Sequence, residues 1–217
     1  MSDGPPERGR FITLEGPEGS GKTTASRHLA EWLRGRGIST FLTHEPGGTP
    51  LGEEVRRIVL HMRGMSDDLD ARADALLYAA GRAQHVARVI RPALERGEWV
   101  VCARYIDSSL AYQGAGYGND PGEMAGLQAF ATAGLRPDLT LLLDVPVEVG
   151  LERTRRRAEW NRFEDTEGAA FFERVRRAYL DLAGAEPDRF RIVDGSGSVE
   201  AADEALRVAV AAAFGLS

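Results

Sequence analysis

The sequence predicts an α/β fold in three layers, with a five-stranded parallel sheet between helices. Five short apolar runs of strand length alternate along the chain with stretches in which apolar residues recur at helical spacing. Strands joined through helices pair in parallel, because each crossover returns the chain in the same direction. The length of 217 residues corresponds to about 1.4 domains at ~150 residues each, which favours one domain with a mobile subregion.

The expected elements follow from local patterns in chain order. Residues 1–9 contain prolines and acids without an apolar run, so we expect a flexible, solvated tail before a single domain over residues 10–217. The five expected strands are rich in apolar and β-branched residues and cover 10–15, 39–43, 99–103, 139–144 and 189–194. One expected helix begins at residue 23, and three others cover 51–61, 70–95 and 199–214. Pro92 should bend the helix over 70–95.

Composition excludes several classes of partner and environment. With 27 basic and 33 acidic residues the formal net charge is −6, which argues against a broad basic face that coats nucleic acid. No run of about 18 apolar residues is present, so we expect no membrane span, and the first residues lack the apolar stretch of a secretory signal. The single cysteine, Cys102, cannot form an internal disulfide. We therefore expect a cytoplasmic protein whose anionic ligands meet local positive charge.

A glycine-rich segment between the first expected strand and helix predicts a phosphate-binding loop (P-loop). Residues 16–23 read Gly-Pro-Glu-Gly-Ser-Gly-Lys-Thr and fit the pattern G-x-x-x-x-G-K-[ST], in which backbone N–H groups and a helix N-terminus surround a phosphate. Lys22 is the only lysine among the 27 basic residues, which makes it a candidate for chemistry that arginine cannot perform. We expect its exposed end to reach the β- and γ-phosphates of ATP, and the Thr23 hydroxyl to bind Mg²⁺.

This motif predicts a bound nucleotide but leaves the fate of its phosphate open. Kinases, switches and motors all use it, and a glycine-rich turn without a ligand is the alternative interpretation. The residues expected to bind ATP are Gly16, Pro17, Glu18, Gly19, Ser20, Gly21, Lys22, Thr23 and Thr24.

Three further segments carry a resemblance to a known family. Residues 43–49 read Thr-His-Glu-Pro-Gly-Gly-Thr, residues 104–114 read Arg-Tyr-Ile-Asp-Ser-Ser-Leu-Ala-Tyr-Gln-Gly, and residues 153–183 contain Arg-Phe-Glu and an arginine-rich helical stretch. In this order, together with the P-loop, they resemble the bacterial form of the thymidylate kinase family over about residues 10–210. The resemblance implies a three-layer P-loop NTPase fold, phosphorylation of dTMP to dTDP by ATP with Mg²⁺, and a homodimer.

For the base of dTMP, the resemblance implies a pocket on the helix after the second strand and on the segment after the third. Tyr78 would stack on thymine, and Arg82 and Gln113 would bind the base edge, with Ser108 and Ser109 close by. Tyr78 and Arg82 are four residues apart, which puts them on one face of a helix. By spacing alone, Tyr78 also fits a helix core, and Ser109 and Gln113 also fit capping groups in an irregular stretch.

For the rest of the acceptor, the resemblance implies further contacts. Arg56 and Arg104 would hold the phosphate, since planar arginines bind phosphate in a bidentate manner. Tyr112 would crowd the 2′ position of the sugar, which favours deoxyribose, and Glu18 would face the 3′-hydroxyl. Glu45 would join the P-loop threonine at the metal ion.

An arginine-rich segment resembles the lid that closes over ATP in this family. It covers about residues 151–165, and its arginines are Arg153, Arg155, Arg156, Arg157 and Arg162. A solvated helix face is the alternative interpretation. The residues expected to act in catalysis are Lys22, Arg104, Arg153 and Arg157, because phosphoryl transfer depends on positioning and charge neutralisation. The resemblance also places adenine near Arg153 and the polar turn at residues 194–196.

Three positions depart from the family pattern. Ala103 stands where the family has an aspartate that helps to hold Mg²⁺, His44 replaces an arginine, and Asn161 replaces an acid before Arg-Phe-Glu. Two alternatives to a thymidylate kinase remain, and Ala103 motivates the second. One is a kinase of another nucleoside monophosphate or deoxynucleoside, and the other is a nucleotide-binding protein with impaired transfer.

Overall fold

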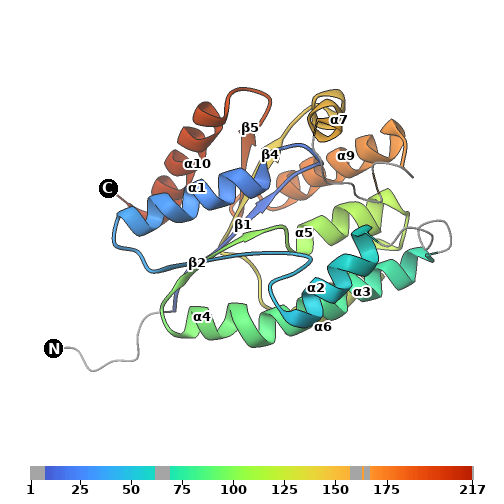
Figure 1. Cartoon of the computed structure of the whole chain (residues 1–217), viewed down its shortest axis with the longest axis horizontal. Coiled ribbons are helices and arrows are strands. Elements are labelled where there is room, and N and C mark those ends of the chain that lie inside the picture. Colours follow the sequence, from blue (N-terminus) through green and yellow to red (C-terminus); the bar gives the residue numbers. More distant parts are fainter. Residues whose placement is uncertain (1–7, 62–68, 157–162, 164–166, 217) are drawn as a thin grey trace.

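A parallel sheet of five strands forms the centre of the computed structural model, which describes residues 8–61, 69–156, 163 and 167–216 (Figure 1). The strands pair in the order β2-β3-β1-β4-β5, and all four pairings are parallel. Their bounds are β1 (Phe11–Glu15), β2 (Thr40–His44), β3 (Trp99–Ala103), β4 (Leu139–Asp144) and β5 (Phe190–Asp194). The predicted fold class is confirmed, and every predicted strand lies within one residue of its observed bounds.

Helices cover both faces of the sheet, as Figure 1 shows. The α-helices are α1 (Lys22–Gly35), α2 (Pro50–Arg56), α3 (Ala71–His85), α4 (Arg91–Glu95), α5 (Ile106–Ser109), α6 (Pro121–Thr132), α7 (Val147–Arg155), α9 (Ala169–Ala185) and α10 (Val199–Phe214). Among the described residues, no helix is both long enough and apolar enough to cross a membrane.

Two of the predicted helices contain a π-helical segment. The helix expected over 51–61 passes from α2 into η1 (Arg57–His61), and the helix expected over 70–95 passes from α3 through η2 (Val86–Ile90) into α4. Pro92 lies in the first turn of α4, where a missing N–H is tolerated. The stretch after β3, expected to be irregular, is instead helical, with α5 followed by η3 (Leu110–Gly116).

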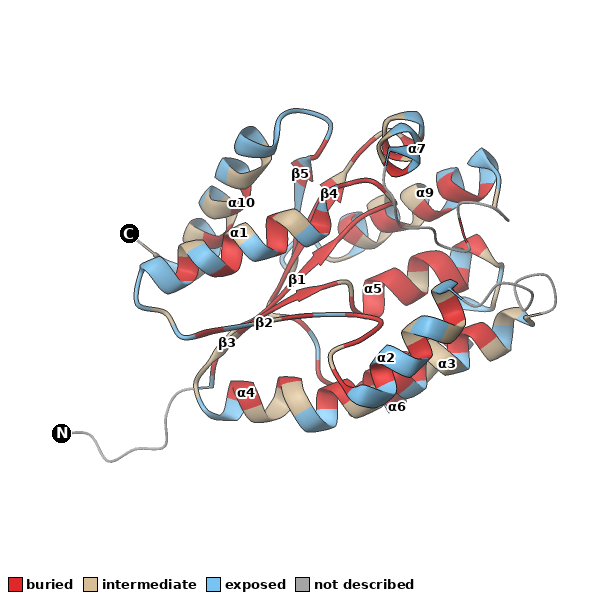
Figure 2. Cartoon of the chain, viewed as in Figure 1, coloured by how far each residue is buried: buried red, intermediate tan, exposed pale blue. Residues whose placement is uncertain are grey.

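The alternation of side chains along the strands divides the core between the two faces of the sheet. On one face, Ile12 and Leu14 of β1 pack with Leu29 of α1 and Leu206 of α10. On the other face, Phe11 packs with residues of η2 and α4. A third cluster joins β4 and β5 to α9 and η3. The central strands β1, β3 and β4 are almost wholly buried, as Figure 2 shows, and they support the loops at their ends.

The carboxyl ends of all the strands lie at one edge of the sheet, because the strands are parallel. β1 is central, with β3 and β2 on one side and β4 and β5 on the other. The chain order therefore reverses around β1, and ligands in such sheets bind in the crevice outside the carboxyl ends at this reversal. The P-loop starts at that point, directly after Glu15.

Candidate functional site

A cavity of about 710 Å³ opens at this edge of the sheet. Its walls come from the P-loop, the start of α1, the segment after β2, α3, and the segment after β3. The predicted site residues that line it are Glu18, Gly19, Gly21, Lys22, Thr23, Thr24, Glu45, Arg56, Tyr78, Arg104, Ser108, Tyr112 and Gln113. The structure thus brings together residues from separate parts of the chain, because the P-loop with α1, the segment after β2, α3 and the segment after β3 are not adjacent in sequence.

The P-loop needs glycine at specific points. Gly19 has φ +72°, and a Cβ atom there would lie 2.1 Å from the carbonyl oxygen of Gly150 in α7. Gly21 has φ +89° and stands directly before α1, where no side chain caps the helix. The N-terminus of α1 therefore presents its backbone N–H groups and partial positive charge to an anion in the loop.

Lys22 folds back on the loop, contrary to the expectation that its end is exposed. Only 7% of the residue is exposed. Its Nζ atom donates to the carbonyl oxygens of Gly16 (2.8 Å) and Pro17 (2.7 Å) and to Oγ of Ser20 (2.9 Å). A buried ammonium group needs such acceptors, and loop carbonyls supply them here. Lys22 is therefore held against the loop by these three acceptors.

Arg104 crosses the cavity to the P-loop. Its Nη2 atom donates to Oε1 of Glu18 over 2.6 Å, and its Nη1 atom donates to Oγ of Ser108 over 3.2 Å. Burial by itself lowers the pKa of Arg104, but Tyr112, Glu18 and other neighbours raise that pKa well above its ordinary value. Arg104 therefore remains a cation in a partly buried position, which is the property that a phosphate contact requires.

Glu45 is buried beside two basic side chains. Its Oε2 atom accepts from Nε of Arg82 (2.7 Å), and its Oε1 atom pairs with Nδ1 of His85 (2.9 Å). Burial raises the pKa of Glu45, but Arg82 and then His85 outweigh burial, so the pKa is lower than usual. Both carboxylate oxygens already accept a hydrogen bond, which makes Glu45 poorly suited to bind a metal ion directly.

Arg82 and Ser109 do not line the cavity in this structure. The Arg82 side chain is 1% exposed and, besides Glu45, donates to Oγ of Ser109 (2.9 Å), to Oε1 of Gln128 and to the carbonyl oxygen of Tyr105 (2.9 Å). In this structure protein acceptors hold Arg82 beneath the cavity wall. Its direct contact with a base remains a prediction.

The other residues expected at the base and sugar lie on the cavity wall. Tyr78 is half-buried in α3 and lines the cavity, so a purely internal core position is excluded. Gln113 donates from Nε2 to Oδ2 of Asp74 over 3.0 Å, so it is not a helix cap. The Tyr112 hydroxyl donates to Oε1 of Glu18 over 3.4 Å, and its ring packs edge-on against Phe163.

The part of the cavity near Arg56 carries a histidine, His44, where the resemblance implies an arginine. His44 lines the cavity beside Arg56, whose Nη1 atom donates to the carbonyl oxygen of Pro46 (3.2 Å). Burial, followed by the charge of Arg56, lowers the pKa of His44. His44 is therefore neutral at pH 7. Ala103 also lines the cavity, so its substitution by aspartate would add a carboxylate at the wall.

Of the two lid arginines expected to act in catalysis, Arg153 is described and Arg157 lies outside the described residues. Arg153 donates from Nη1 to the carbonyl oxygen of Gly195 (2.6 Å) and from Nη2 to that of Ser196 (2.9 Å). These bonds connect α7 to the turn after β5, where adenine is expected. Most of the segment from 157 to 165, including Asn161 and Arg162, also lies outside the described residues.

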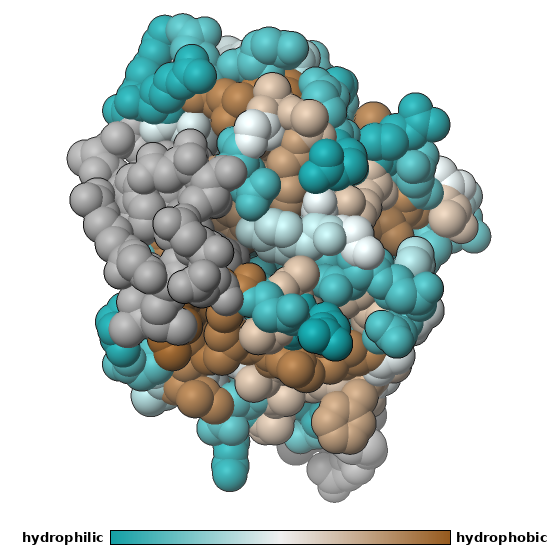
Figure 3. Space-filling model, turned by 90° about the vertical axis from the view of Figure 1, so that its right-hand side faces the viewer, coloured by the Kyte–Doolittle hydropathy of each residue, from teal (hydrophilic) through white to brown (hydrophobic). Residues whose placement is uncertain are grey.

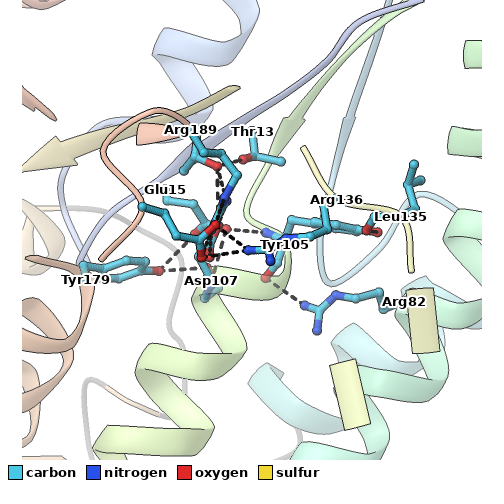
Figure 4. A network of polar contacts seen from close by, with 12 residues as sticks. Thr13, Glu15, Arg82, Tyr105, Asp107, Leu135, Arg136, Tyr179 and Arg189 are labelled. Atoms are coloured by element: carbon cyan, nitrogen blue, oxygen red, sulfur yellow. Dashed lines mark hydrogen bonds and ion pairs between the residues drawn. The ribbon is translucent and has the colours of Figure 1, made fainter. Parts of the chain in front are cut away.

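Sequence reasoning missed several buried polar residues behind the cavity. Glu15 accepts four hydrogen bonds, His85 supports Glu45, and Asp107 pairs with Arg189 over 2.7 Å (Figure 4). An acid at the carboxyl end of a buried strand, next to the P-loop, is a signal that could have drawn attention to Glu15. No local sequence pattern indicates the pair of Asp107 and Arg189, since the two residues are 82 positions apart.

Comparisons of this chain with a family model, with known sequences and with solved structures all identify similarity to thymidylate kinases. A family model described as thymidylate kinase matches residues 14–206. A protein of Pseudomonas syringae pv. tomato named Thymidylate kinase is 52% identical over 192 residues, which are 88% of this chain and 90% of that protein. One of the same name from Pseudomonas putida is 51% identical and covers 89% of this chain and 90% of that protein. A crystal structure of thymidylate kinase from Ehrlichia chaffeensis is similar with a TM-score of 0.73 and 33% identity, covering 93% of this chain and 99% of that one.

Proposed function

This chain belongs to the thymidylate kinase family, and we propose on that premise how its residues phosphorylate dTMP to dTDP with ATP. The observation that carries the proposal is that the P-loop and most of the residues expected to bind dTMP line one cavity. Two ligands bound there would have their phosphates between Lys22 and Arg104. The alternative of a nucleotide-binding protein with impaired transfer is not favoured, because relatives at about 52% identity are named thymidylate kinases.

ATP is proposed to bind along the P-loop from Gly16 to Thr24. The N-terminus of α1 and the ammonium group of Lys22 would neutralise charge on its phosphates, which supports transfer through electrostatic stabilisation. Arg153 and the turn at residues 194–196 would form the adenine end, in keeping with the hydrogen bonds that join them. Arg157 and the rest of the lid over about 151–165 would complete the site on closure and exclude water.

The acceptor dTMP is proposed to bind on the opposite wall of the same cavity. Tyr78 would stack on the base and Gln113 would bind its edge, while Arg56 and Arg104 would hold the phosphate. The buried Tyr112 would restrict the 2′ position of the sugar.

Two further acceptor-site roles follow. Glu18 reaches the same wall and would face the 3′-hydroxyl, with Ser108 beside the phosphate-binding arginine. Arg82, with Ser109, would support the base pocket from beneath through its buried pair with Glu45.

Mg²⁺ fits one side of the P-loop. The Thr23 residue is exposed at the start of α1 and lines the cavity, and Mg²⁺ commonly combines one or two protein oxygens with phosphate oxygens and water. Among the described residues no group of three or more acids, histidines or cysteines could hold a metal ion by itself. We propose that Thr23 is the direct protein ligand and that Glu45 acts only through water. When bound, the ion would neutralise charge on the phosphates of ATP.

A homodimer is proposed to form through α2, α3 and α6. Each of these helices exposes a large apolar side chain, namely Leu51 (48%), Leu76 (58%) and Phe130 (87%). Figure 3 shows apolar side chains gathered in the lower half of one face of the molecule. Apolar surface of this kind commonly marks a protein interface. We further propose one kinase domain over residues 10–217 and a cytoplasmic location, where its nucleotide substrates would be found.

Release of ADP tests the acceptor. Initial rates would be measured with ATP and each of dTMP, dUMP and dCMP, and without an acceptor. We expect the highest kcat/KM with dTMP and only background release without an acceptor. Equal kcat/KM values for the three acceptors would contradict the proposed base pocket, and equal release with and without dTMP would contradict transfer.

A further inference from the structure

Glu15 is a wholly buried acid at the carboxyl end of β1, directly before the P-loop (Figure 4). Its Oε1 atom accepts from the backbone N of Tyr105 (2.7 Å) and of Ser108 (3.3 Å). Its Oε2 atom accepts from Oγ of Ser108 (2.6 Å) and from the hydroxyl of Tyr179 (3.0 Å). All four bonds lead to Tyr105, to Ser108 of α5 or to Tyr179 of α9, and none of the four leads into the P-loop.

The turn that Glu15 holds contains Arg104, whose backbone has an unusual conformation. Arg104 has φ +67°, in the left-handed region that residues other than glycine rarely occupy. Such residues persist only where the surrounding structure holds them firmly. The backbone N of Arg104 donates to the carbonyl oxygen of Leu14 (2.9 Å), and the next backbone N, of Tyr105, donates to Glu15. Consecutive residues of β1 therefore fix the peptide groups on both sides of Arg104.

The side chain of Arg104 is supported by the same group of residues. Its Nη1 atom lies 3.2 Å from Oγ of Ser108 and 3.5 Å from the hydroxyl of Tyr179, and these two oxygens are 2.8 Å apart. Both hydroxyls are also bound to Glu15. Glu15 thus orients the backbone of Arg104 directly and its guanidinium group through one intermediate hydroxyl.

We propose that Glu15 is a positioning residue for the acceptor phosphate, acting by holding Arg104 in its left-handed conformation with the guanidinium group facing the cavity. The inference rests on the proposed role of Arg104 at the dTMP phosphate. Tyr179 is the second member of the arrangement, because it joins Glu15, Ser108 and Arg104 from α9.

A role limited to the core does not explain an acid at this position. Ile12 and Leu14 on the same strand are wholly buried and apolar, and burying a carboxyl group is more costly than burying either of them. The donors to Glu15 are backbone N–H groups and hydroxyls of the Arg104 turn and α9, so the cost is offset only if that turn has a defined geometry. An apolar residue could not bind the backbone N of Tyr105.

The test compares KM for dTMP with KM for ATP in Glu15→Ala, Glu15→Gln and Tyr179→Phe. Arg104→Ala serves as the reference for loss of the arginine, and Thr13→Val as the matched control. Thr13 lies two residues earlier on β1, where its hydroxyl bonds to that of Thr140 over 2.9 Å, so its substitution removes a buried hydrogen bond in which neither Glu15 nor Arg104 takes part. Thermal unfolding of each variant separates loss of stability from loss of acceptor binding.

We expect Glu15→Ala to raise KM for dTMP on the order of 10- to 100-fold, because a misplaced binding group loses that much, with a much smaller change in KM for ATP. Glu15→Gln should recover most of the loss, since its amide oxygen can accept from Tyr105. Tyr179→Phe should raise the ratio of KM for dTMP to KM for ATP by a smaller factor, and Thr13→Val should leave this ratio unchanged.

The inference would be overturned if Glu15→Ala changed both KM values equally, or if Glu15→Gln recovered none of the loss. It would also be overturned if Thr13→Val raised KM for dTMP relative to KM for ATP as much as Glu15→Ala does. If Glu15→Ala does not fold, Tyr179→Phe still decides the matter, since an unchanged ratio of KM for dTMP to KM for ATP in that variant would count against the inference. If Arg104→Ala leaves KM for dTMP unchanged, the proposed role of Arg104 fails, and this inference fails with it. If only Arg104→Ala shifts the ratio, the role of Arg104 stands and that of Glu15 does not.

Discussion

Arg82 and Glu45 form an ion pair that is almost completely enclosed by the protein. The distance from Nε of Arg82 to Oε2 of Glu45 is 2.7 Å, and the side chains are 1% and 4% exposed. The pair joins α3 to the segment after β2, so it connects two walls of the cavity. Removing one member of such a pair leaves an uncompensated charge in the interior, which is far more costly than losing an exposed pair.

Arg82→Ala should therefore lower the free energy of unfolding by about 3–5 kcal/mol, because Glu45 would lose its main counter-charge. Urea unfolding measures this change. The double variant Arg82→Ala/Glu45→Gln should be more stable than Arg82→Ala alone, since no buried carboxylate remains. A single variant as stable as the parent, with a raised KM for dTMP only, would instead indicate that Arg82 serves the base and not the fold.

Lys22→Ala should abolish phosphoryl transfer while the protein remains folded. The substitution removes the donor for the carbonyl oxygens of Gly16 and Pro17, so we also expect a loss of about 1–3 kcal/mol in stability. Lys22→Arg should transfer poorly as well, since a planar guanidinium group does not fit the position of a compact ammonium group. ADP release and thermal unfolding would be measured together. Near-normal turnover in either variant would contradict the role of Lys22.

The fold could be predicted from the sequence to the extent that local patterns determine it. The strand, glycine loop and helix around residues 11–35 were predicted correctly, because turn chemistry and apolar periodicity agree there. The π-helical segments η1 and η2 were missed, since one added residue in a turn scarcely alters an amphipathic pattern. The order of the strands depends on long-range pairing, which no local pattern encodes.

The candidate site, too, could be predicted where local motifs define it and not where it depends on contacts between distant segments. Residues within recognisable motifs, such as Thr23 and Glu18, lie on the cavity wall as expected. The burial of Arg82 among protein acceptors could not be predicted, because these acceptors come from segments 23 to 46 positions away, and no single segment shows that they enclose it. Glu15 was missed for a related reason, because its partners lie 90 or more positions along the chain.

The stability of Glu15→Gln relative to the parent should depend on pH. Burial, and then the charge of Asp107, raises the pKa of Glu15 above its ordinary value of 4.5. Between the unfolded and folded pKa values the folded state binds more protons, so the contribution of Glu15 to stability is present below the unfolded value and is lost as pH rises through the folded value. Glutamine cannot titrate and avoids this loss.

Urea unfolding of both proteins between about pH 4 and pH 8 measures the effect. The free energy of unfolding of Glu15→Gln minus that of the parent should increase with pH, whatever its absolute sign. Thr13→Val should show a constant difference from the parent, because it removes no titrating group. A difference for Glu15→Gln that is flat or falls with pH would show that the pKa of Glu15 is not raised.

Ala103→Asp should strengthen the response to Mg²⁺. Ala103 ends β3, lines the cavity and is 6% exposed, so a carboxylate there would border the space in which the phosphates of ATP are proposed to lie. Carboxylate oxygen is a ligand that Mg²⁺ favours, either directly or through water. We expect a lower Mg²⁺ concentration at half-maximal rate and a higher kcat, with little change in KM for dTMP.

The matched control is Ala103→Asn, which adds a side chain of nearly the same size without a charge. Initial rates against Mg²⁺ concentration, at saturating ATP and dTMP, would be measured for the parent and both variants. If steric fit alone mattered, aspartate and asparagine would have the same effect, whereas an electrostatic contribution to the metal requires that only aspartate shift the curve. The aspartate variant should also lose some stability in the absence of Mg²⁺ and ATP, because a partly buried carboxylate lacks a counter-charge there. Coincident curves for the parent and Ala103→Asp would mean that this end of β3 does not border the metal site.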